Sequence, residues 1–341
     1  MYKSVVANIR TNRLLHEVML ELTFDCNLDC FYCYNDKNAN GKPLSLDQYQ
    51  VLFDDLERMQ VLGISLTGGE PMAHPHFFEI GKMARERGFV VRIKSNGHAL
   101  RAKAVDRIKQ EMDPLNIKMS LHGATPETHD RQTRVKGSFE RLISNIRYMK
   151  SIGLRTSLIT TPTAWNWHEF EQMIDLAEEL GVRLSMQGPV APRDNGDNEP
   201  LEIQPTDEQW EAVNAIARRR QLGSRNQRET LKAPSAQTAL NYSANKVPKN
   251  CGSGLDSIVI DPFGEVLTCL HLRWSGGNLH VQDIDTIWNH SPVFGNASDM
   301  TERAFAQFGD QQPSLFGAQT FCPAVQINSG CGGCGGKCGG G

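Results

Sequence analysis

The sequence has no long apolar runs. No stretch of 18 apolar residues occurs among its 341 residues, which argues against a membrane-spanning helix. Its first 20 residues include Arg10, Arg13 and His16 and do not resemble a secretory signal peptide. The formal net charge is only −3, so no overall field favours nucleic acid or an acidic membrane. These absences predict a cytoplasmic protein that has neither nucleic acid nor a membrane as a partner.

Cysteine is absent from residues 34–250, although the chain contains nine cysteines. They form an early cluster, Cys26, Cys30 and Cys33, and a late group, Cys251, Cys269, Cys322, Cys331, Cys334 and Cys338. A disulfide framework normally spreads an even number of cysteines through a small secreted chain. The two dense clusters instead indicate metal ligation in a reducing compartment.

Strand and helix patterns alternate up to residue 187. The predicted strands are 17–24, 64–67, 89–94, 117–121, 155–160 and 182–187, and the predicted helices are 45–60, 76–87, 100–111, 137–151 and 167–180. This order predicts an α/β fold in which a parallel sheet, with helices outside, curves into a partial (β/α)6 barrel of the TIM type. In such folds the chemistry gathers in the loops that follow the strands.

The alternating pattern ends near residue 190, where prolines and glycines become frequent. We therefore predict a barrel over 1–192, a linker with a bridging helix over 193–248, and a small cysteine-rich domain over 249–341. The linker helix is expected at 207–221, and the last domain is expected to begin with a hairpin at 255–270, followed by loops. The final twelve residues contain eight glycines, so they bury no core and need a metal to become ordered.

The early cysteines directly follow the first predicted strand, in the spacing Cys26-x3-Cys30-x2-Cys33. Three thiolates in a short loop can hold three irons of a [4Fe–4S] cube, whereas most electron-transfer clusters have four cysteine ligands. The fourth iron is then free to bind a small molecule, such as the amino and carboxylate groups of a methionine moiety. A zinc site is the alternative, but structural zinc usually has four protein ligands.

The Cys-x3-Cys-x2-Cys motif resembles the signature of the radical S-adenosylmethionine superfamily, and the resemblance extends over residues 17 to about 190. Tyr32 corresponds to the family's aromatic residue before the last cysteine, whose backbone typically meets the adenine. Thr67–Pro71 resembles the Gly-Gly-Glu-Pro loop, in which exposed backbone and Glu70 accept the methionine ammonium. The resemblance thus assigns to the cofactor site the residues Gly68, Gly69, Glu70 and Pro71. By itself, a Gly-Gly pair is more often a tight turn.

Further motifs of this family follow in order. Ser95 and Asn96 match its Thr/Ser-Asn-Gly turn, and Ser120 lies in a segment whose serine contacts the ribose or the carboxylate side of the cofactor. His122 stands where the family commonly has Asp, which alters the face toward the substrate. Arg131 is a candidate for the cofactor carboxylate or the substrate, the alternative being a surface charge. Gln187 lies where an adenine-contacting segment is expected.

The resemblance implies an enzyme that reductively cleaves S-adenosylmethionine to a 5′-deoxyadenosyl radical, which then abstracts hydrogen from its substrate. The electron comes from an external donor of the flavodoxin or ferredoxin type. A non-catalytic iron–sulfur electron carrier is an alternative, but a carrier has no need of the Gly-Gly-Glu-Pro loop.

The late cysteines resemble a second feature of this superfamily, the SPASM/twitch extension, through the spacing Cys251-x12-Gly264-x4-Cys269. Ligand preference favours iron–sulfur clusters over zinc for this group. The final spacings depart from the seven-cysteine SPASM pattern, so one or two auxiliary [4Fe–4S] clusters are expected, with two favoured.

SPASM relatives mostly modify peptides, so the resemblance implies a maturase that acts on a ribosomal precursor peptide by crosslinking, epimerisation or backbone excision. About 16 residues precede the first predicted strand, which leads us to expect a separate leader-peptide-binding protein. A basic run could guide an acidic leader, although such runs are usually solvated faces; it comprises Arg218, Arg219, Arg220, Arg225, Arg228 and Lys232. The alternative substrate is a small molecule, a sugar or a tetrapyrrole, changed by a radical dehydrogenase, decarboxylase or epimerase.

Overall fold

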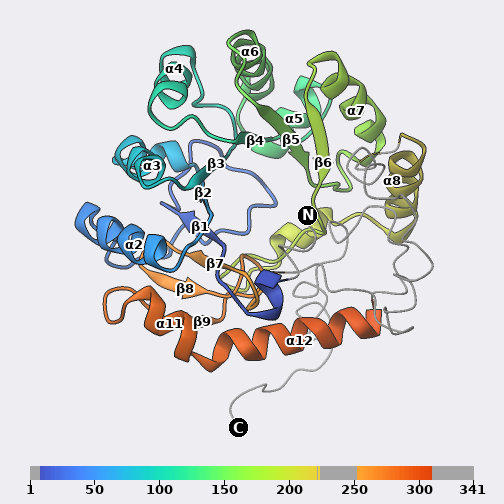
Figure 1. Ribbon diagram of the computed structural model, residues 1–341. Coiled ribbons are helices and arrows are strands. Elements are labelled where there is room, and N and C mark those ends of the chain that lie inside the picture. The colour runs from blue at the N-terminus through green and yellow to red at the C-terminus, as the bar shows by residue number, and fades with distance from the viewer. Residues whose placement is uncertain (1–7, 221, 223–251, 309–341) are drawn as a thin grey trace, which may run out of the picture.

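The computed structural model describes residues 8–220, 222 and 252–308. Six parallel strands form the barrel wall, and their bounds are β1 Glu17–Glu21, β2 Gly63–Thr67, β3 Val90–Ser95, β4 Asn116–Ser120, β5 Thr156–Thr160 and β6 Arg183–Met186. The helices between them are α2 Leu46–Arg58, α3 Phe77–Glu86, α4 Ala102–Glu111, α5 Pro126–Thr133, α6 Ser138–Ser151 and α7 Phe170–Glu179. Figure 1 shows these helices on the outside of the curved sheet. The predicted partial (β/α)6 barrel is confirmed.

The sheet also extends on the other side of β1, away from β2, through three further strands. Its strand order is β6-β5-β4-β3-β2-β1-β7-β8-β9, where β7 is Ser257–Ile260, β8 is Glu265–Leu267 and β9 is Ser275–Asn278. Strand β7 pairs parallel with β1, and β8 pairs antiparallel with β7, as the expected hairpin requires. The cysteine-rich region is therefore joined to the barrel by backbone hydrogen bonds. The domain boundaries at 192 and 248 stay a prediction.

Alternation along the strands separates an apolar outer face from a polar inner face. On β1, Val18 and Leu20 are buried against the helices. The intervening Glu17 accepts a hydrogen bond from the Ser65 hydroxyl (3.0 Å), and Glu21 accepts one from the Tyr34 hydroxyl (3.1 Å). Because successive side chains of a strand point to opposite faces, the core lies between sheet and helices and leaves the barrel interior polar.

Several helices have weak sequence signals. The structure adds α5, which has little apolar periodicity but is capped by Thr125, whose hydroxyl accepts the Thr128 N–H. It also forms α11 Ile284–His290 and α12 Pro292–Phe308, where the sequence led us to expect loops. Buried Ile284, Ile287 and Trp288 anchor α11. Short helices of this kind depend on tertiary packing more than on local propensity.

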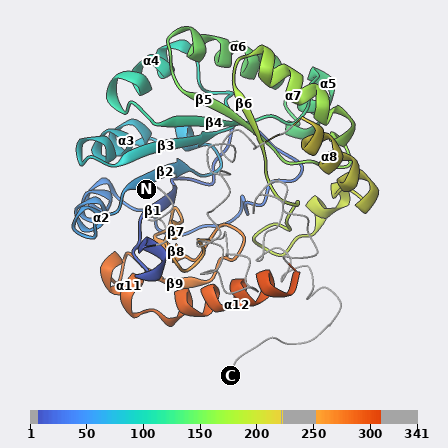
Figure 2. The same ribbon diagram turned by 45° about the vertical axis from the view of Figure 1, so that its right-hand side comes forward.

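The segment after β6 crosses back toward the cysteine-rich region. It contains the short 3-10 helix η3, Glu199–Ile203, and helix α8, Asp207–Arg219, which begins with a capping box at Thr206 and Gln209. Helix α8 confirms the helix expected at 207–221, and Figure 2 shows it beside α7. Among the residues that the structure describes, no helix combines the length and apolar character needed to cross a bilayer.

Candidate functional site

A cavity opens at the carboxyl ends of the barrel strands, where the alternating pattern predicts the chemistry to lie. Its lining includes all three early cysteines together with Tyr32. It also includes most of the other predicted cofactor-site residues, namely Gly68, Gly69, Ser95, Asn96, Ser120 and Gln187. Loops that follow β1, β2, β3, β4 and β6 thus meet at one site. The roles predicted for these residues remain predictions.

The three cysteines of this site are free thiols. Burial raises the pKa of each of them, most of all that of Cys30, and neighbouring thiols raise the pKa of Cys30 and Cys26 further. The Cys26 sulfur accepts the Leu28 N–H (3.4 Å) and the Asn96 side-chain amide (3.5 Å). Buried thiolates need cationic partners, and three irons of a cube would supply them. The donor set therefore fits a [4Fe–4S] cluster.

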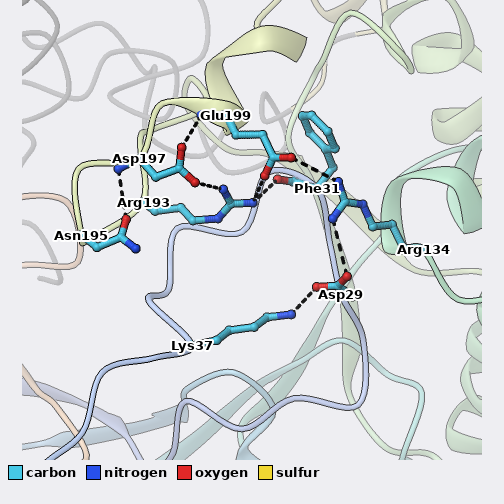
Figure 3. A network of polar contacts seen from close by, with 8 residues as sticks. All are labelled: Asp29, Phe31, Lys37, Arg134, Arg193, Asn195, Asp197 and Glu199. Carbon is cyan, nitrogen blue, oxygen red and sulfur yellow. Dashed lines mark hydrogen bonds and ion pairs between the residues drawn. The ribbon is translucent and has the colours of Figure 1, made fainter.

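Ion pairs hold the cysteine loop from two sides (Figure 3). The Arg193 guanidinium, in the segment after β6, donates to the Phe31 carbonyl (3.3 Å) and pairs with Glu199 (2.6 Å). Arg134 pairs with Asp29 (3.5 Å) and Glu199 (3.6 Å). Charged hydrogen bonds of this kind fix geometry better than neutral ones. The loop between Cys26 and Cys33 is therefore anchored to segments distant in the sequence.

The two glycines after β2 allow close backbone packing. A Cβ added at Gly68 would lie 2.3 Å from the Thr23 carbonyl oxygen, and one added at Gly69 would lie 2.5 Å from the carbonyl oxygens of Phe24 and Asp25. The Gly69 N–H donates to the Thr23 carbonyl at 2.7 Å. The family resemblance implies that this loop exposes its backbone to the methionine ammonium, and the structure adds that its glycines let it pack against the backbone leading into Cys26.

Glu70 is buried below the cavity wall, with only 1% of its surface exposed. Its carboxylate accepts the Asn96 N–H (2.9 Å), the Ser95 hydroxyl (2.9 Å to Oε2) and the Met72 N–H (3.3 Å). Glu70 thus orients the Ser95–Asn96 turn that lines the cavity. Pro71 opens the short 3-10 helix η1, Pro71–Ala73. Contact between Glu70 and a methionine ammonium remains a prediction.

Stability is expected to depend on pH through Glu70. Burial raises its pKa from 4.5 to about 7, only partly offset by its hydrogen bonds. The unfolded chain therefore loses this proton at lower pH than the folded chain. Glu70 contributes stability that is fully present below pH 4.5 and is lost as the pH rises through about 7. The loss amounts to about 3 kcal/mol, because a pKa of about 7 in place of 4.5 corresponds to about 1.36 kcal/mol for each pH unit between them.

Urea unfolding of wild type and Glu70→Gln between pH 5 and 8 measures this dependence. In Glu70→Gln an amide N–H replaces an acceptor that faces a donor, which costs stability at every pH, but the slope of stability against pH should lack the Glu70 contribution, so the difference between the two proteins should change with pH. Parallel curves for the two proteins would show that Glu70 does not titrate in this range.

Beyond β4, His122 faces the cavity next to Tyr32. Its Nδ1 lies 3.0 Å from the Tyr32 hydroxyl, and its backbone N–H donates to Nδ1 of His129 (3.2 Å). Burial holds the pKa of His122 well below 6.5, so the imidazole is neutral. At position 122, where the family commonly has the carboxylate of Asp, this chain therefore presents the neutral imidazole of His122.

Arg131 lies apart from the cavity lining. Its guanidinium is 4.0 Å from the Trp165 ring centroid. The predicted role of Arg131 in cofactor binding remains a prediction.

Our sequence analysis did not identify two lysines that line the same cavity. Lys94 on β3 and Lys118 on β4 line it with the cysteines. Both occur inside predicted strands at alternate positions, in the patterns Arg92-Ile93-Lys94 and Asn116-Ile117-Lys118. Polar residues alternating with apolar ones in the strands of a barrel are the signal that could have found them.

Of the late cysteines, only Cys269 is among the described residues. It follows β8, and its sulfur accepts the Leu272 N–H (3.1 Å). The adjacent Leu270 lines the cavity, so the segment that follows β8 reaches the site. The remaining predicted ligands, Cys251, Cys322, Cys331, Cys334 and Cys338, lie outside the described residues. Their ligation remains a prediction.

The basic run is partly described, and its arginines have acidic partners. Arg219 pairs with Glu171 on α7 (2.6 Å), and Arg220 pairs with Asp175 (2.5 Å) and Glu178 (2.9 Å) on the same helix. Arg218 pairs with Glu211 within α8. These charges hold α8 against α7 and are largely neutralised. Arg225, Arg228 and Lys232 lie outside the described residues.

Comparison with known proteins gives two family matches. The model of the Radical SAM superfamily matches residues 20–177, and that of the SPASM iron–sulfur cluster-binding domain matches residues 251–310. The chain is 26% identical to the AdoMet-dependent heme synthase of Methanosarcina barkeri, covering 83% of this chain and 84% of that one. It is 28% identical to the mycofactocin maturase MftC of Mycobacterium ulcerans, covering 80% of this chain and 74% of that one.

Two further comparisons concern peptide-modifying relatives and the fold. The PqqA peptide cyclase of Ruegeria pomeroyi is 32% identical over 49% of this chain and 45% of its own. Among solved structures, SuiB of Streptococcus suis superposes with a TM-score of 0.65 at 14% identity, covering 89% of this chain and 74% of that one. The described chain thus shares the fold of SuiB.

Proposed function

Because the chain belongs to the radical SAM superfamily and carries a SPASM domain, we propose that it modifies a ribosomally made precursor peptide by abstracting hydrogen from it. A [4Fe–4S] cluster and S-adenosylmethionine, when bound, supply the radical that does so. The observation that carries the proposal is the cavity in which three free thiols meet the loops after β2, β3, β4 and β6. An electron carrier has no use for such a cavity.

In this proposal, the chain's own residues bind and orient the cofactors. Cys26, Cys30 and Cys33 would hold three irons of the cluster, and the fourth iron would be open to the methionine moiety. Glu70 positions Ser95 and Asn96 through its buried hydrogen bonds, and Ser120 and Gln187 border the nucleoside side. The cavity wall limits water at the reacting atoms.

A peptide substrate is supported by the relatives. A maturase matches over 80% of this chain and a peptide cyclase over 49%. The second candidate, an enzyme that modifies a tetrapyrrole, is favoured by the heme synthase match over 83% of the chain. For the peptide reading we further propose a separate leader-binding protein, an external electron donor of the flavodoxin or ferredoxin type, and two auxiliary clusters ligated from Cys251 to Cys338.

The test uses anaerobically reconstituted full-length protein with S-adenosylmethionine and a reductant. We expect 5′-deoxyadenosine to form and a short peptide encoded near the gene to be modified. Mass spectrometry in D₂O separates the chemistries: a crosslink loses hydrogens, an epimerised residue gains deuterium, and excision removes backbone atoms. Turnover of an iron tetrapyrrole with no change in any peptide would favour the second candidate, and absence of 5′-deoxyadenosine would contradict both.

A further inference from the structure

Lys94 and Lys118 form a pair of cations on the inner face of the barrel. They face each other in the register of β3 and β4, and both side chains line the cavity that contains the three cysteines. Within the part of the chain that the structure describes, the Lys94 ammonium donates only to the Met19 sulfur, at 3.5 Å, and sulfur is a weak acceptor. Neither lysine has an ion pair with any residue of the described chain. Among the described residues both lysines thus lack an ion-pair partner, although Glu17 and Glu21 are near enough to act on the charge of Lys94, and Glu17 on that of Lys118.

The nearest acidic groups are already engaged elsewhere. Glu17 binds the Ser65 hydroxyl (3.0 Å) and Arg92 (3.5 Å). Glu21 binds Arg273 (2.8 Å) and the Tyr34 hydroxyl. Arg92 and Arg183 add further positive charge to this face, and His271 is held neutral because burial lowers its pKa to about 4. The cavity floor therefore carries an excess of positive charge.

Burying a cation that has no ion-pair partner is energetically unfavourable. Burial and the charge of Lys118 lower the pKa of Lys94 to about 8, so its ammonium is still mostly protonated at pH 7. A carboxylate between the two lysines would offset the repulsion and form charge-assisted hydrogen bonds with both.

We propose that Lys94 and Lys118 bind a carboxylate of the peptide substrate, either an Asp or Glu side chain or the C-terminus, next to the residue that is modified. This inference rests on the proposed peptide function. It assigns the substrate class as a peptide that is acidic at the modified position.

The positions of the two lysines along their strands favour the substrate, rather than the cofactor, as the source of the carboxylate. Lys118 precedes Ser120 by two residues on β4, and Lys94 precedes Asn96 by two residues at the end of β3. Two residues of strand span about 6.6 Å, so the lysines lie one pleat deeper in the barrel than the loops assigned to the cofactor. S-adenosylmethionine also has a carboxylate, and the test must separate the two.

The test measures binding without turnover. The reconstituted full chain is titrated without reductant, first with S-adenosylmethionine and then with a fluorescein-labelled copy of the peptide modified in the assay above. Lys94→Met and Lys118→Met should each weaken peptide binding at least tenfold and leave the affinity for S-adenosylmethionine within twofold. Lys94→Arg, which keeps the charge, should stay within a few-fold of wild type. Lys103→Met, the same change on the exposed face of α4, is the matched control.

Peptide variants identify the carboxylate. Each Asp or Glu is replaced by Asn or Gln, and the C-terminus is amidated. One replacement should weaken binding to wild type at least tenfold but have little further effect on Lys94→Met, since both changes remove the same contact. Equal loss of affinity for S-adenosylmethionine, or no coupling with any peptide carboxylate, would overturn the inference and leave the proposed function intact. If no peptide is bound or modified by wild type, the proposed function itself fails, and the inference with it.

Discussion

Replacing Cys30 by alanine is expected to abolish cleavage of S-adenosylmethionine. Cys30 lies in the middle of the anchored loop, between Asp29 and Phe31, whose contacts with Arg134 and Arg193 hold it toward the cavity. Without this thiolate one iron of the cube has no protein ligand. Loss of groups that merely support a metal ligand costs about 10–100-fold, so loss of the ligand should lower 5′-deoxyadenosine formation by at least about 100-fold. Cys26→Ala and Cys33→Ala should behave alike.

Chromatography of 5′-deoxyadenosine and iron analysis of the reconstituted proteins measure this effect. Cys269→Ala is the matched control, because it removes a cysteine of the second group and leaves the early loop unchanged. Cys269→Ala should lose iron and peptide product while it still cleaves S-adenosylmethionine. A Cys30→Ala protein with wild-type iron content and cleavage would disprove the assignment of the early cysteines.

Gly69→Ala is expected to have the second largest effect. The added methyl group would lie 2.5 Å from two carbonyl oxygens of the segment Phe24–Asp25, and these are backbone atoms that cannot rotate away. The Gly69 and Glu70 N–H groups also donate to the carbonyls of Thr23 and Asp25, so the two loops would separate together. Overpacking of this kind costs about 1–3 kcal/mol or more. Because Cys26 directly follows Asp25, we expect at least tenfold lower 5′-deoxyadenosine formation and reduced iron retention.

The control for this substitution is Gly295→Ala on α12. A Cβ at Gly295 would meet only the Arg13 guanidinium, at 3.7 Å, which is ordinary contact. In a helix, alanine is favoured over glycine by about 1 kcal/mol, so this variant should be at least as stable as wild type. Iron content and thermal unfolding of the two variants are then compared. Equal iron retention in both would show that the glycine loop does not support the cysteine segment.

Long-range contacts explain where sequence and structure differ. Helix α5 has almost no apolar periodicity, yet the N–H groups of Asp29 and Phe31, about 100 residues earlier in the chain, donate to the carbonyls of Thr133 (3.1 Å) and Gln132 (3.0 Å) and so fix its end. Helix α11 depends on Trp288, whose indole N–H donates to the Arg13 carbonyl (3.2 Å) from across the chain. No local pattern contains such partners, so both segments were missing from our prediction.

The amino-acid sequence by itself determined the strand–helix alternation, the barrel class and the early cysteine loop. Periodicity and ligand spacing are local properties, written within a few residues of each other. Only the tertiary structure decided that Glu70 supports the Ser95–Asn96 turn, that Gly69 packs on the segment before Cys26, and that Lys94 faces Lys118. These relations arise because parallel strands bring residues that are distant in sequence to one edge and one face of the sheet, where burial sets their charge and their partners.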